Sequence, residues 1–547
     1  MRRDVAIAAG CFGAFAAHAW SYGDWIVDDA GISFAYARNL ALGHGLVSHP
    51  AAQPVEGYSN LLWVALLAPF FRLGLFDPVL TPKLLAGAFA LLAFAALYDL
   101  TRRVSGSRCA AALALLLLAG NPAFAVWAVS GLENALTAAL VAALARSVAL
   151  RPERPAAAGA LAALLALCRP EGAAFALLYP LRRLLVREDR GGGSPGQDVV
   201  RSLWVFAIPF GAFLAFRVLT FGALLPNTFH APLKASSLAE PDKLLPLLAL
   251  GPPVWSKVAG LFRAALGPLG PWTAILLALG LAHAAGARRL GPSARALALA
   301  TLLSLAVYVV LPADWMPEFR FATPFLVLSS SLLCAGLRPP RTGPLARRVA
   351  PALALAVVLA SAGASFASRA RRFPAEAPIS LGDVVRRMES LAEWARELGI
   401  EGPTLLCPDA GGAFYAGVFE VVDLGGLADP VIARTLERDG PAFREYVFGR
   451  RRPILIETHG LWTWLGRLER DPRFRAEYAP IVEYEDPFAL RAYGESLASG
   501  VFVRRSAIAR DAALAPLQAR LRALPRRVLA HSLGLPEAVV GTPRAGG

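Results

Sequence analysis

The chain has 547 residues, of which 56% are hydrophobic and 17% are charged, and its formal net charge is +15 at pH 7. Soluble proteins carry about 25% charged residues, and the apolar residues here fall in blocks of the roughly 20 residues that a bilayer-spanning helix requires. The composition therefore predicts a polytopic α-helical membrane protein. The positive charge does not indicate a nucleic-acid partner, because arginine gathers in short loops between the apolar blocks, as the positive-inside rule describes, without any nucleic-acid-binding motif.

The N-terminus reads Met1-Arg2-Arg3 and is followed by an apolar run that ends at Trp20. We interpret this run as the first membrane span. The alternative is a cleavable signal peptide, because Ala17-His18-Ala19 fits the small-x-small cleavage pattern. Both interpretations place the residues after Trp20 outside the cytoplasm.

Further apolar blocks bring the predicted number of spans to about eleven. The apolar stretch 59–75 is not counted, because counting it would place Arg102, Arg103 and Arg108 outside and reverse every later loop; we expect it to lie in the membrane interface. This choice puts the arginine-rich loops in the cytoplasm and the polar segments 21–60, 129–134, 169–172, 222–234 and 313–320 together on the outer face. The later spans are predicted near residues 79–101, 109–127, 131–149, 156–168, 171–186, 201–221, 268–286, 296–312, 322–337 and 349–366.

The C-terminal region, 367–547, loses the spanning pattern. Short β-like runs at Leu405–Cys407, Phe419–Val422 and Ile454–Ile456 alternate with helical stretches at 380–398 and 506–530. This alternation predicts a small α/β domain, which the span count places outside the cytoplasm. We therefore divide the chain into a transmembrane domain, 1–366, whose first outer loop 21–60 carries the candidate catalytic residues, and a second, extracytoplasmic domain, 367–547.

Two adjacent carboxylates, Asp28 and Asp29, follow the first span by a few residues. Carboxylates near a bilayer are costly to desolvate and are seldom incidental. One could accept a proton from an acceptor hydroxyl, and the other could position the acceptor or bind a cation. We slightly favour Asp28 as the base, because it lies closer to the end of the first span. The alternative is that the pair caps a helix over 30–42, since Asp is a preferred N-cap residue.

Other polar residues of the outer segments are candidates for binding a donor or an acceptor. Those before 61–75 could line a sugar site or cap that helix, and Arg169 could pair with Glu171 instead of binding a substrate. The loop after 201–221 offers hydrogen-bond donors and a fixed cation that suit a lipid phosphate, or it forms a simple turn after Pro226. Arg320 could bind a phosphate or pair with a neighbouring carboxylate, Asp314 or Glu318. The predicted set is Arg38, Glu56, Tyr58, Asn60, Glu133, Arg169, Glu171, Asn227, Thr228, His230, Lys234, Asp314 and Arg320.

Several classes of protein are disfavoured by motifs that the sequence lacks. It contains no G-x-x-x-x-G-K-[ST] loop, which argues against ATP-driven transport, and no H-E-x-x-H zinc motif. No run of charged residues occupies the centre of a span, so an ion-coupled pump is poorly supported. The five cysteines form no C-x-x-C pair and predict neither a disulfide framework nor a zinc site.

The string "DDAGISFAYARNLALGHGLV…VEGYSNLLW" resembles the opening of the GT-C class of membrane glycosyltransferases. Together with "SGLEN", "CRPEG", "LLPNTFHA", "DWMPEFRFATP" and "DAGGAFYAGVFEVVDLGGLAD", in this order, it is most similar to the group around the terminal arabinofuranosyltransferase of mycobacterial cell-wall arabinan. The resemblance implies a polyprenyl-phosphate sugar donor and transfer outside the bacterial cytoplasmic (inner) membrane. It points to Asp28 and Asp29 as the catalytic carboxylates and to Asn227, Lys234 and Arg320 near the donor phosphate. No cofactor is required, although a divalent cation could take part.

We therefore expect a glycosyltransferase that moves a sugar, with arabinofuranose as a candidate, to a cell-envelope glycan or lipid acceptor. One alternative is a lipid or glycan transporter, which would show polar residues within spans or inverted repeats; the sequence shows neither. The other is a non-catalytic assembly protein. In that case, replacing Asp28, Asp29 and Arg320 together would change only stability.

Overall fold

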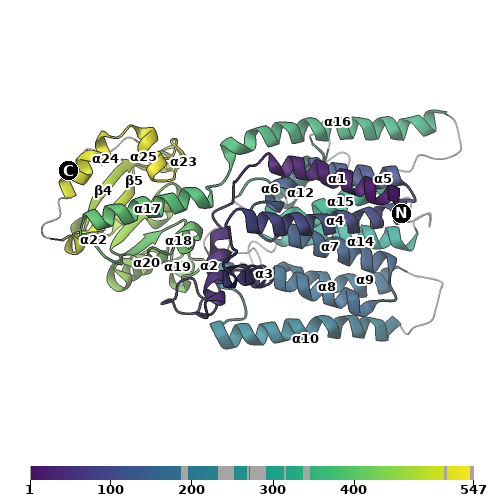
Figure 1. Ribbon diagram of the computed structural model, residues 1–547, viewed down its shortest axis with the longest axis horizontal. Coiled ribbons are helices and arrows are strands. Elements are labelled where there is room, and N and C mark those ends of the chain that lie inside the picture. Colours follow the sequence, from purple (N-terminus) through teal and green to yellow (C-terminus); the bar gives the residue numbers. More distant parts are fainter. Residues whose placement is uncertain are drawn as a thin grey trace.

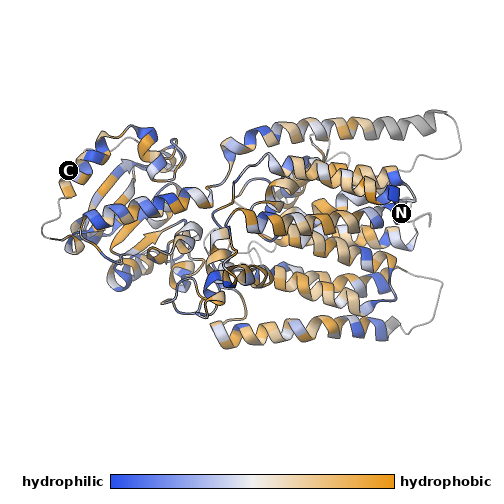
Figure 2. Ribbon diagram, viewed as in Figure 1, coloured by the Kyte–Doolittle hydropathy of each residue, from blue (hydrophilic) through white to orange (hydrophobic). Residues whose placement is uncertain are grey.

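The computed structural model describes residues 2–186, 195–231, 252–267, 270, 291–312, 316–336, 345–509 and 514–541. It consists of a long helical bundle with an α/β part at one end (Figure 1). Apolar residues cover most of the bundle, and polar residues are frequent over the α/β part (Figure 2). The bundle contains α1 (Arg2–Trp20), α4 (Leu80–Ser105), α5 (Arg108–Gly120), α6 (Pro122–Ala128), α7 (Asn134–Leu150), α8 (Pro155–Cys168), α9 (Leu178–Leu185), α10 (Pro195–Phe221), α12 (Pro252–Leu266), α14 (Pro292–Val310), α15 (Thr323–Gly336) and α16 (Leu345–Glu376).

Three described helices are long and apolar enough to cross a membrane: α4, α10 from Gly196, and α14. A fourth crossing results if α5 and α6 count as one span, although these helices meet at an angle of 68°. The bend falls at Asn121, whose side chain caps α6, and Pro122 starts the new helix, where a proline is well tolerated. The predicted span 171–186 is split between a 3₁₀ segment, η1 (Pro170–Leu177), and α9. The span 268–286 lies almost entirely outside the described residues, and the count of eleven stays a prediction.

The stretch that we did not count as a span forms α3 (Leu61–Arg72), a helix of 12 residues. A helix of this length rises about 18 Å at 1.5 Å per residue, which is less than the bilayer core of about 30 Å. Its length agrees with the choice to leave 59–75 out of the count.

Segments predicted to face the cytoplasm meet at the end of the bundle opposite the α/β part. Asp4 of α1 forms ion pairs with Arg102 (3.2 Å) and Arg108 (3.0 Å), which flank the turn between α4 and α5. The N-terminus and this turn therefore share one end of the bundle. Which side of the membrane that end faces stays a prediction.

We expect reporter fusions to assign opposite sides of the membrane to the two ends of the molecule. A fusion at Gly192, between α9 and α10, should report the cytoplasm, and a fusion at Ala498, in the α/β part, should report the outside, because arginine-rich loops are retained inside. A phosphatase reporter and a fluorescent reporter at each position give this readout. Matching readouts at both positions would contradict the span count.

The α/β part is built on a five-stranded sheet with the order β2-β1-β3-β5-β4. The three β-like runs of the sequence are confirmed as β1 (Thr404–Cys407), β2 (Glu420–Asp423) and β3 (Leu455–Thr458), which pair in parallel. β5 (Ala498–Arg504) and β4 (Tyr478–Glu485) continue the sheet in antiparallel fashion. Separate hydrophobic clusters lie on the two faces, one including Met388 of α17 (Leu381–Glu397) and the other including Phe443 of α20 (Gly440–Glu445).

The carboxyl ends of the three parallel strands lie at one edge of the sheet, the usual place for ligands in open α/β sheets. Helix α18 (Ala410–Ala416) starts at this edge after β1 and packs against α2 (Ala30–Ala41) of the first outer loop. The sheet thus presents its carboxyl edge to the loop that carries the acidic pair (Figure 1). Helix α16 continues past the predicted division at residue 366 as far as Glu376, and the division itself stays a prediction.

Candidate functional site

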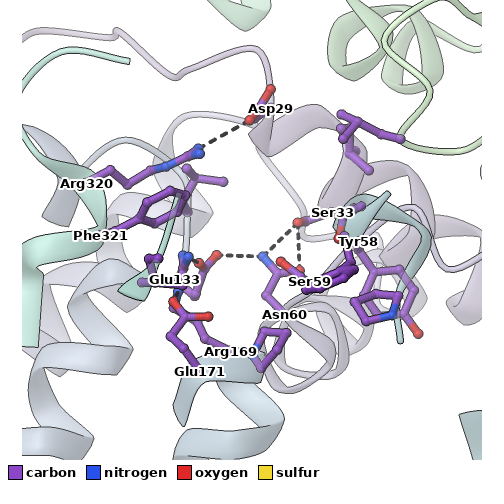
Figure 3. Close-up of a pocket in the computed structure, with 18 of the residues that line it drawn as sticks. Asp29, Ser33, Tyr58, Ser59, Asn60, Glu133, Arg169, Glu171, Arg320 and Phe321 are labelled. Carbon is purple, nitrogen blue, oxygen red and sulfur yellow. Dashed lines mark hydrogen bonds and ion pairs between the residues drawn. The ribbon is translucent and has the colours of Figure 1, made fainter. Parts of the chain in front are cut away.

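The main cavity, of about 340 Å³, opens where the bundle meets the α/β part, and its walls come from loops that are distant in the sequence (Figure 3). They come from α2, the segment before α3, the start of α7, the end of α8 and the segments around 225–229 and 320–321. The polar segments predicted to share one face therefore meet at one place. The predicted residues that line the cavity are Asp29, Tyr58, Asn60, Glu133, Arg169, Glu171, Thr228 and Arg320.

Asp29 and Arg320 form an ion pair across the cavity. Arg320 Nη1 donates to Asp29 Oδ2 at 3.2 Å, and the guanidinium also lies over the rings of Trp127 and Phe321. Asp29 occupies the N-cap position of α2, but its side chain makes no capping hydrogen bond. A purely capping role, which the sequence left open, therefore does not describe this carboxylate.

The backbone before Arg320 is held in an unusual conformation. Glu318 and Phe319 have φ values of 63° and 52°, in the left-handed region that residues other than glycine rarely adopt. Arg369 of α16 donates to both carboxylate oxygens of Glu318, which fixes this turn to the bundle. Among the described residues, Arg320 and Glu318 do not pair with each other: Arg320 pairs with Asp29, and Glu318 pairs with Arg369. Asp314 lies outside the described residues.

A second polar cluster surrounds Arg169. Its guanidinium donates to Glu171 and, at 2.5 Å, to Glu133 Oε1. Asn60 Nδ2 donates to the other oxygen of Glu133 at 2.6 Å and to Ser33 Oγ at 3.0 Å. Burial alone would lower the pKa of Arg169, but the carboxylates of Glu171 and Glu133 raise it, so the guanidinium stays charged. The pairing with Glu171 that the sequence suggested is present, within a larger network.

Asp28 is directed away from the main cavity and toward the α/β part. Its carboxylate accepts hydrogen bonds from Gly412 N at 2.6 Å and Gly411 N at 3.2 Å, at the start of α18. A Cβ at Gly411 would collide with the Asp28 backbone, and one at Gly31 with the Gly411 backbone. Burial, with the nearby charges of Asp409 and Asp29, raises the pKa of Asp28 well above its usual value. The Asp28 side chain therefore joins the helical bundle to the α/β part through backbone hydrogen bonds, and its raised pKa favours the neutral form.

A smaller cavity, of about 50 Å³, lies beside the main one at the carboxyl edge of the sheet. Asp28, Asp409 and Trp462 line it, and Asp29 lines both cavities. Asp409 is fixed by Arg387, which donates to Asp409 Oδ2 at 2.8 Å and to Glu457 Oε2 at 3.1 Å. Asp409 and Trp462 were not predicted as site residues, and the available signal was their position after the β-like runs Leu405–Cys407 and Ile454–Ile456.

Other predicted residues hold the loops in place. Arg38 donates to the carbonyls of Tyr415 (2.7 Å) and Phe414 (3.0 Å) at the end of α18. Asn227 donates to the carbonyls of Gly426 and Leu427, both at 2.9 Å. Both side chains therefore join the bundle to the α/β part, and neither is among the residues that line the main cavity.

Glu56 is paired with a residue that the sequence analysis missed. Arg217 of α10 donates from Nη2 to Glu56 Oε1 at 3.0 Å, and its Nε lies 2.6 Å from Oε2 in the same ion pair. Both side chains are buried. Burial raises the pKa of Glu56 even beside this cation. Arg217 lies inside the predicted span 201–221, so the prediction that no polar residue lies within a span was wrong. This arginine was the available signal, because charges in spans are rarely unpaired.

The loop after α10 is described only in part. Thr228 lines the main cavity, and His230 lies half-buried next to it, where burial and the charges of Arg434 and Arg438 lower its pKa. Lys234 lies outside the described residues. Within the described residues, no three His, Cys, Asp or Glu side chains are gathered so that they could hold a metal ion, and the optional role of a divalent cation stays a prediction.

No protein-family model and no curated protein matches the chain, but solved structures share its fold. ArnT from Cupriavidus metallidurans in the apo state aligns with a TM-score of 0.51 and 14% identity, over 81% of this chain and 91% of that one. AglB from Archaeoglobus fulgidus, an archaeal oligosaccharyltransferase solved with an inhibitory peptide and a dolichol-phosphate, aligns with a TM-score of 0.52 and 11% identity, over 93% and 75%. These neighbours are GT-C glycosyltransferases, so the chain has the fold of that class. The closer resemblance to the arabinofuranosyltransferase group stays a prediction.

Proposed function

We propose that this protein is a GT-C-type glycosyltransferase that transfers a sugar from a polyprenyl-phosphate donor to a hydroxyl of an envelope glycan or lipid, at the outer face of the bacterial inner membrane. The observation that carries the proposal is the position of Asp29. It lies between the two cavities and is paired with Arg320. A base and a cation for the leaving group thus stand side by side.

The larger cavity suits the donor. Its walls are mostly apolar, and it contains Arg320 and the Arg169 cluster. AglB, which shares the fold, was solved with a dolichol-phosphate, a lipid of the same chemical class as the proposed donor. A lipid-linked donor reaches this place within the bilayer, so a nucleotide-binding motif is unnecessary. Arginine recognises phosphate oxygens through charge-assisted, often bidentate hydrogen bonds.

The reaction needs a proton acceptor and charge stabilisation. The acceptor oxygen attacks the anomeric carbon, its proton passes to Asp29, and the bond between the anomeric carbon and the phosphate oxygen breaks with its electrons on the phosphate. Arg320 then stabilises the phosphate charge. A donor phosphate that binds Arg320 also releases Asp29 from its ion pair, so donor binding prepares the base. We therefore assign the base to Asp29, in place of the slight preference for Asp28 drawn from its distance to the first span.

The smaller cavity suits the acceptor hydroxyl, because it adjoins Asp29 and has the aromatic wall of Trp462. A single displacement of this kind inverts the anomeric centre. The sequence resemblance supports arabinofuranose as the sugar. The proposal as a whole is tested by sugar transfer with purified protein in lipid and by mass spectrometry of envelope glycans from a deletion strain. Unchanged glycans together with no transfer to any envelope acceptor would contradict it.

We expect Trp462→Ala to weaken acceptor binding selectively. Loss of an aromatic contact is worth about 0.5–1.5 kcal/mol beyond its buried area, so the KM for the acceptor should rise about tenfold while donor affinity stays unchanged. Trp464→Ala is the matched control, because Trp464 stacks on Tyr493 with ring centroids 4.0 Å apart and is not among the residues that line either cavity. An equal rise of KM in both variants would argue against an acceptor site at Trp462.

A further inference from the structure

A third hollow, larger than either cavity of the candidate active site, lies in the bundle and away from that site. It is a groove of about 600 Å³ with α7 as its floor and α4 and α8 as its walls. The mouth of the groove, at the end of the bundle opposite the α/β part, lies beside Asp99, which pairs with Arg103 near the turn between α4 and α5. The groove therefore ends where the N-terminus and the arginine-rich turns meet.

The groove is apolar along its length and basic at this end. Phe89, Leu92, Leu140 and Leu161 line the apolar part, and alanines on all three helices leave the space open. The charged lining residues are Asp99, Arg146, Arg151 and Arg154.

The acidic member of this group is already neutralised. Asp99 accepts from Arg103 and from Arg146, each at 2.7 Å. In the part of the chain that the structure describes, the side chains of Arg151 and Arg154 form no hydrogen bond or ion pair. Glu153, which lies between them in the sequence, is exposed and does not line the groove. The mouth of the groove is left with a positive charge and free donors.

We propose that this groove binds an anionic phospholipid, with its phosphate diester on Arg151 and Arg154 and an acyl chain along α7. Basic pockets between transmembrane helices at the cytoplasmic end bind anionic lipid headgroups, and arginine suits the phosphate. The apolar length of the groove favours a lipid over a soluble phosphate, which would leave that part empty. This site is distinct from the donor and acceptor cavities and does not depend on the proposed function.

The test uses the full chain in a neutral detergent, titrated with phosphatidylglycerol or with phosphatidylcholine of the same chains, and follows thermal unfolding. Wild type should be stabilised more by phosphatidylglycerol. Each basic residue near an anionic lipid contributes about 1 kcal/mol, so Arg151→Gln/Arg154→Gln should weaken phosphatidylglycerol binding roughly thirtyfold. Arg371→Gln/Arg372→Gln, an exposed pair on α16 with the same charge change, is the control and should bind like wild type.

Two further arms separate the parts of the proposal. Ala143→Phe fills the groove without changing charge and should also weaken phosphatidylglycerol binding, whereas glycerol phosphate, a headgroup without chains, should not stabilise the protein. No lipid preference in wild type, or an unchanged preference in the Arg151/Arg154 variant, would overturn the site. Normal binding by Ala143→Phe, or full stabilisation by glycerol phosphate, would overturn the assignment of a lipid chain to the groove.

Discussion

Asp29→Asn is expected to reduce sugar transfer by at least about a hundredfold, because a positioned general base contributes about 10²–10⁴-fold to the rate. Asn keeps the size of the side chain, and the Asp29 side chain makes no capping hydrogen bond, so α2 should form and the variant should fold. Binding of the polyprenyl-phosphate sugar should be retained or strengthened, because the Asp29 carboxylate no longer competes with the donor phosphate for Arg320. Transfer by purified protein in lipid and donor binding are measured on the same samples.

Asp28→Asn is the matched control, with the same change one residue away. Asp28 accepts two backbone hydrogen bonds from the start of α18, and Asn retains one acceptor oxygen. The loss of one such bond costs about 1–3 kcal/mol of stability, while transfer at saturating acceptor should fall by much less than a hundredfold, because Asp28 does not take the proton in the proposed reaction. A hundredfold loss in Asp28→Asn with normal turnover in Asp29→Asn would return the base to Asp28. Near-normal transfer by both variants would end the catalytic interpretation of this loop.

Arg217→Met is expected to destabilise the protein by about 3–5 kcal/mol, because it leaves Glu56 buried without its cation. The double variant Glu56→Gln/Arg217→Met removes both charges and should recover much of this loss. Arg201→Met is the control on the same helix, since Arg201 is exposed and exposed substitutions usually change stability by less than about 0.5 kcal/mol. Chemical unfolding in detergent measures all three.

The destabilisation by Arg217→Met should also depend on pH. Burial already raises the pKa of Glu56, and removal of the cation raises it further. The folded state then holds a proton that the unfolded state releases, so stability falls as the pH rises above the unfolded value of about 4.3. The variant should therefore be closer to wild type at pH 5 than at pH 8. An equal deficit at both values would mean that lost packing, rather than an unpaired carboxylate, causes the effect.

The sequence predicted which segments meet but not what each side chain does there. The arginine pattern placed the outer segments on one face, and the structure brings residues as distant as Asp29, Glu133 and Arg320 to one cavity. The three β-like runs also form strands in the structure, because short, mostly apolar runs between turn-forming residues are a strand signal in the sequence itself.

The residues that join the two parts could not be identified in this way. Asp28, Arg38 and Asn227 form hydrogen bonds with backbone groups of the α/β part. Because every residue has such groups, no sequence pattern identifies the residues to which these side chains bond. The adjacent carboxylates could be told apart only by a slight preference for Asp28, drawn from its distance to the first span. The different environments of Asp28 and Asp29 depend on the direction of the backbone at the start of α2, which the spacing of residues in the sequence does not determine.

The glycine contact between α2 and α18 makes the first outer loop mechanically stiff. Gly31 and Gly411 bring two backbones together with no side chain between them, and close-packed backbone transmits displacement because it has little compressibility. Asp29 lies one residue from the carboxylate that holds this contact. A ligand that shifts α18 is therefore expected to shift Asp29, the proposed base, as well, so that occupancy at the carboxyl edge of the sheet would change the position of this carboxylate.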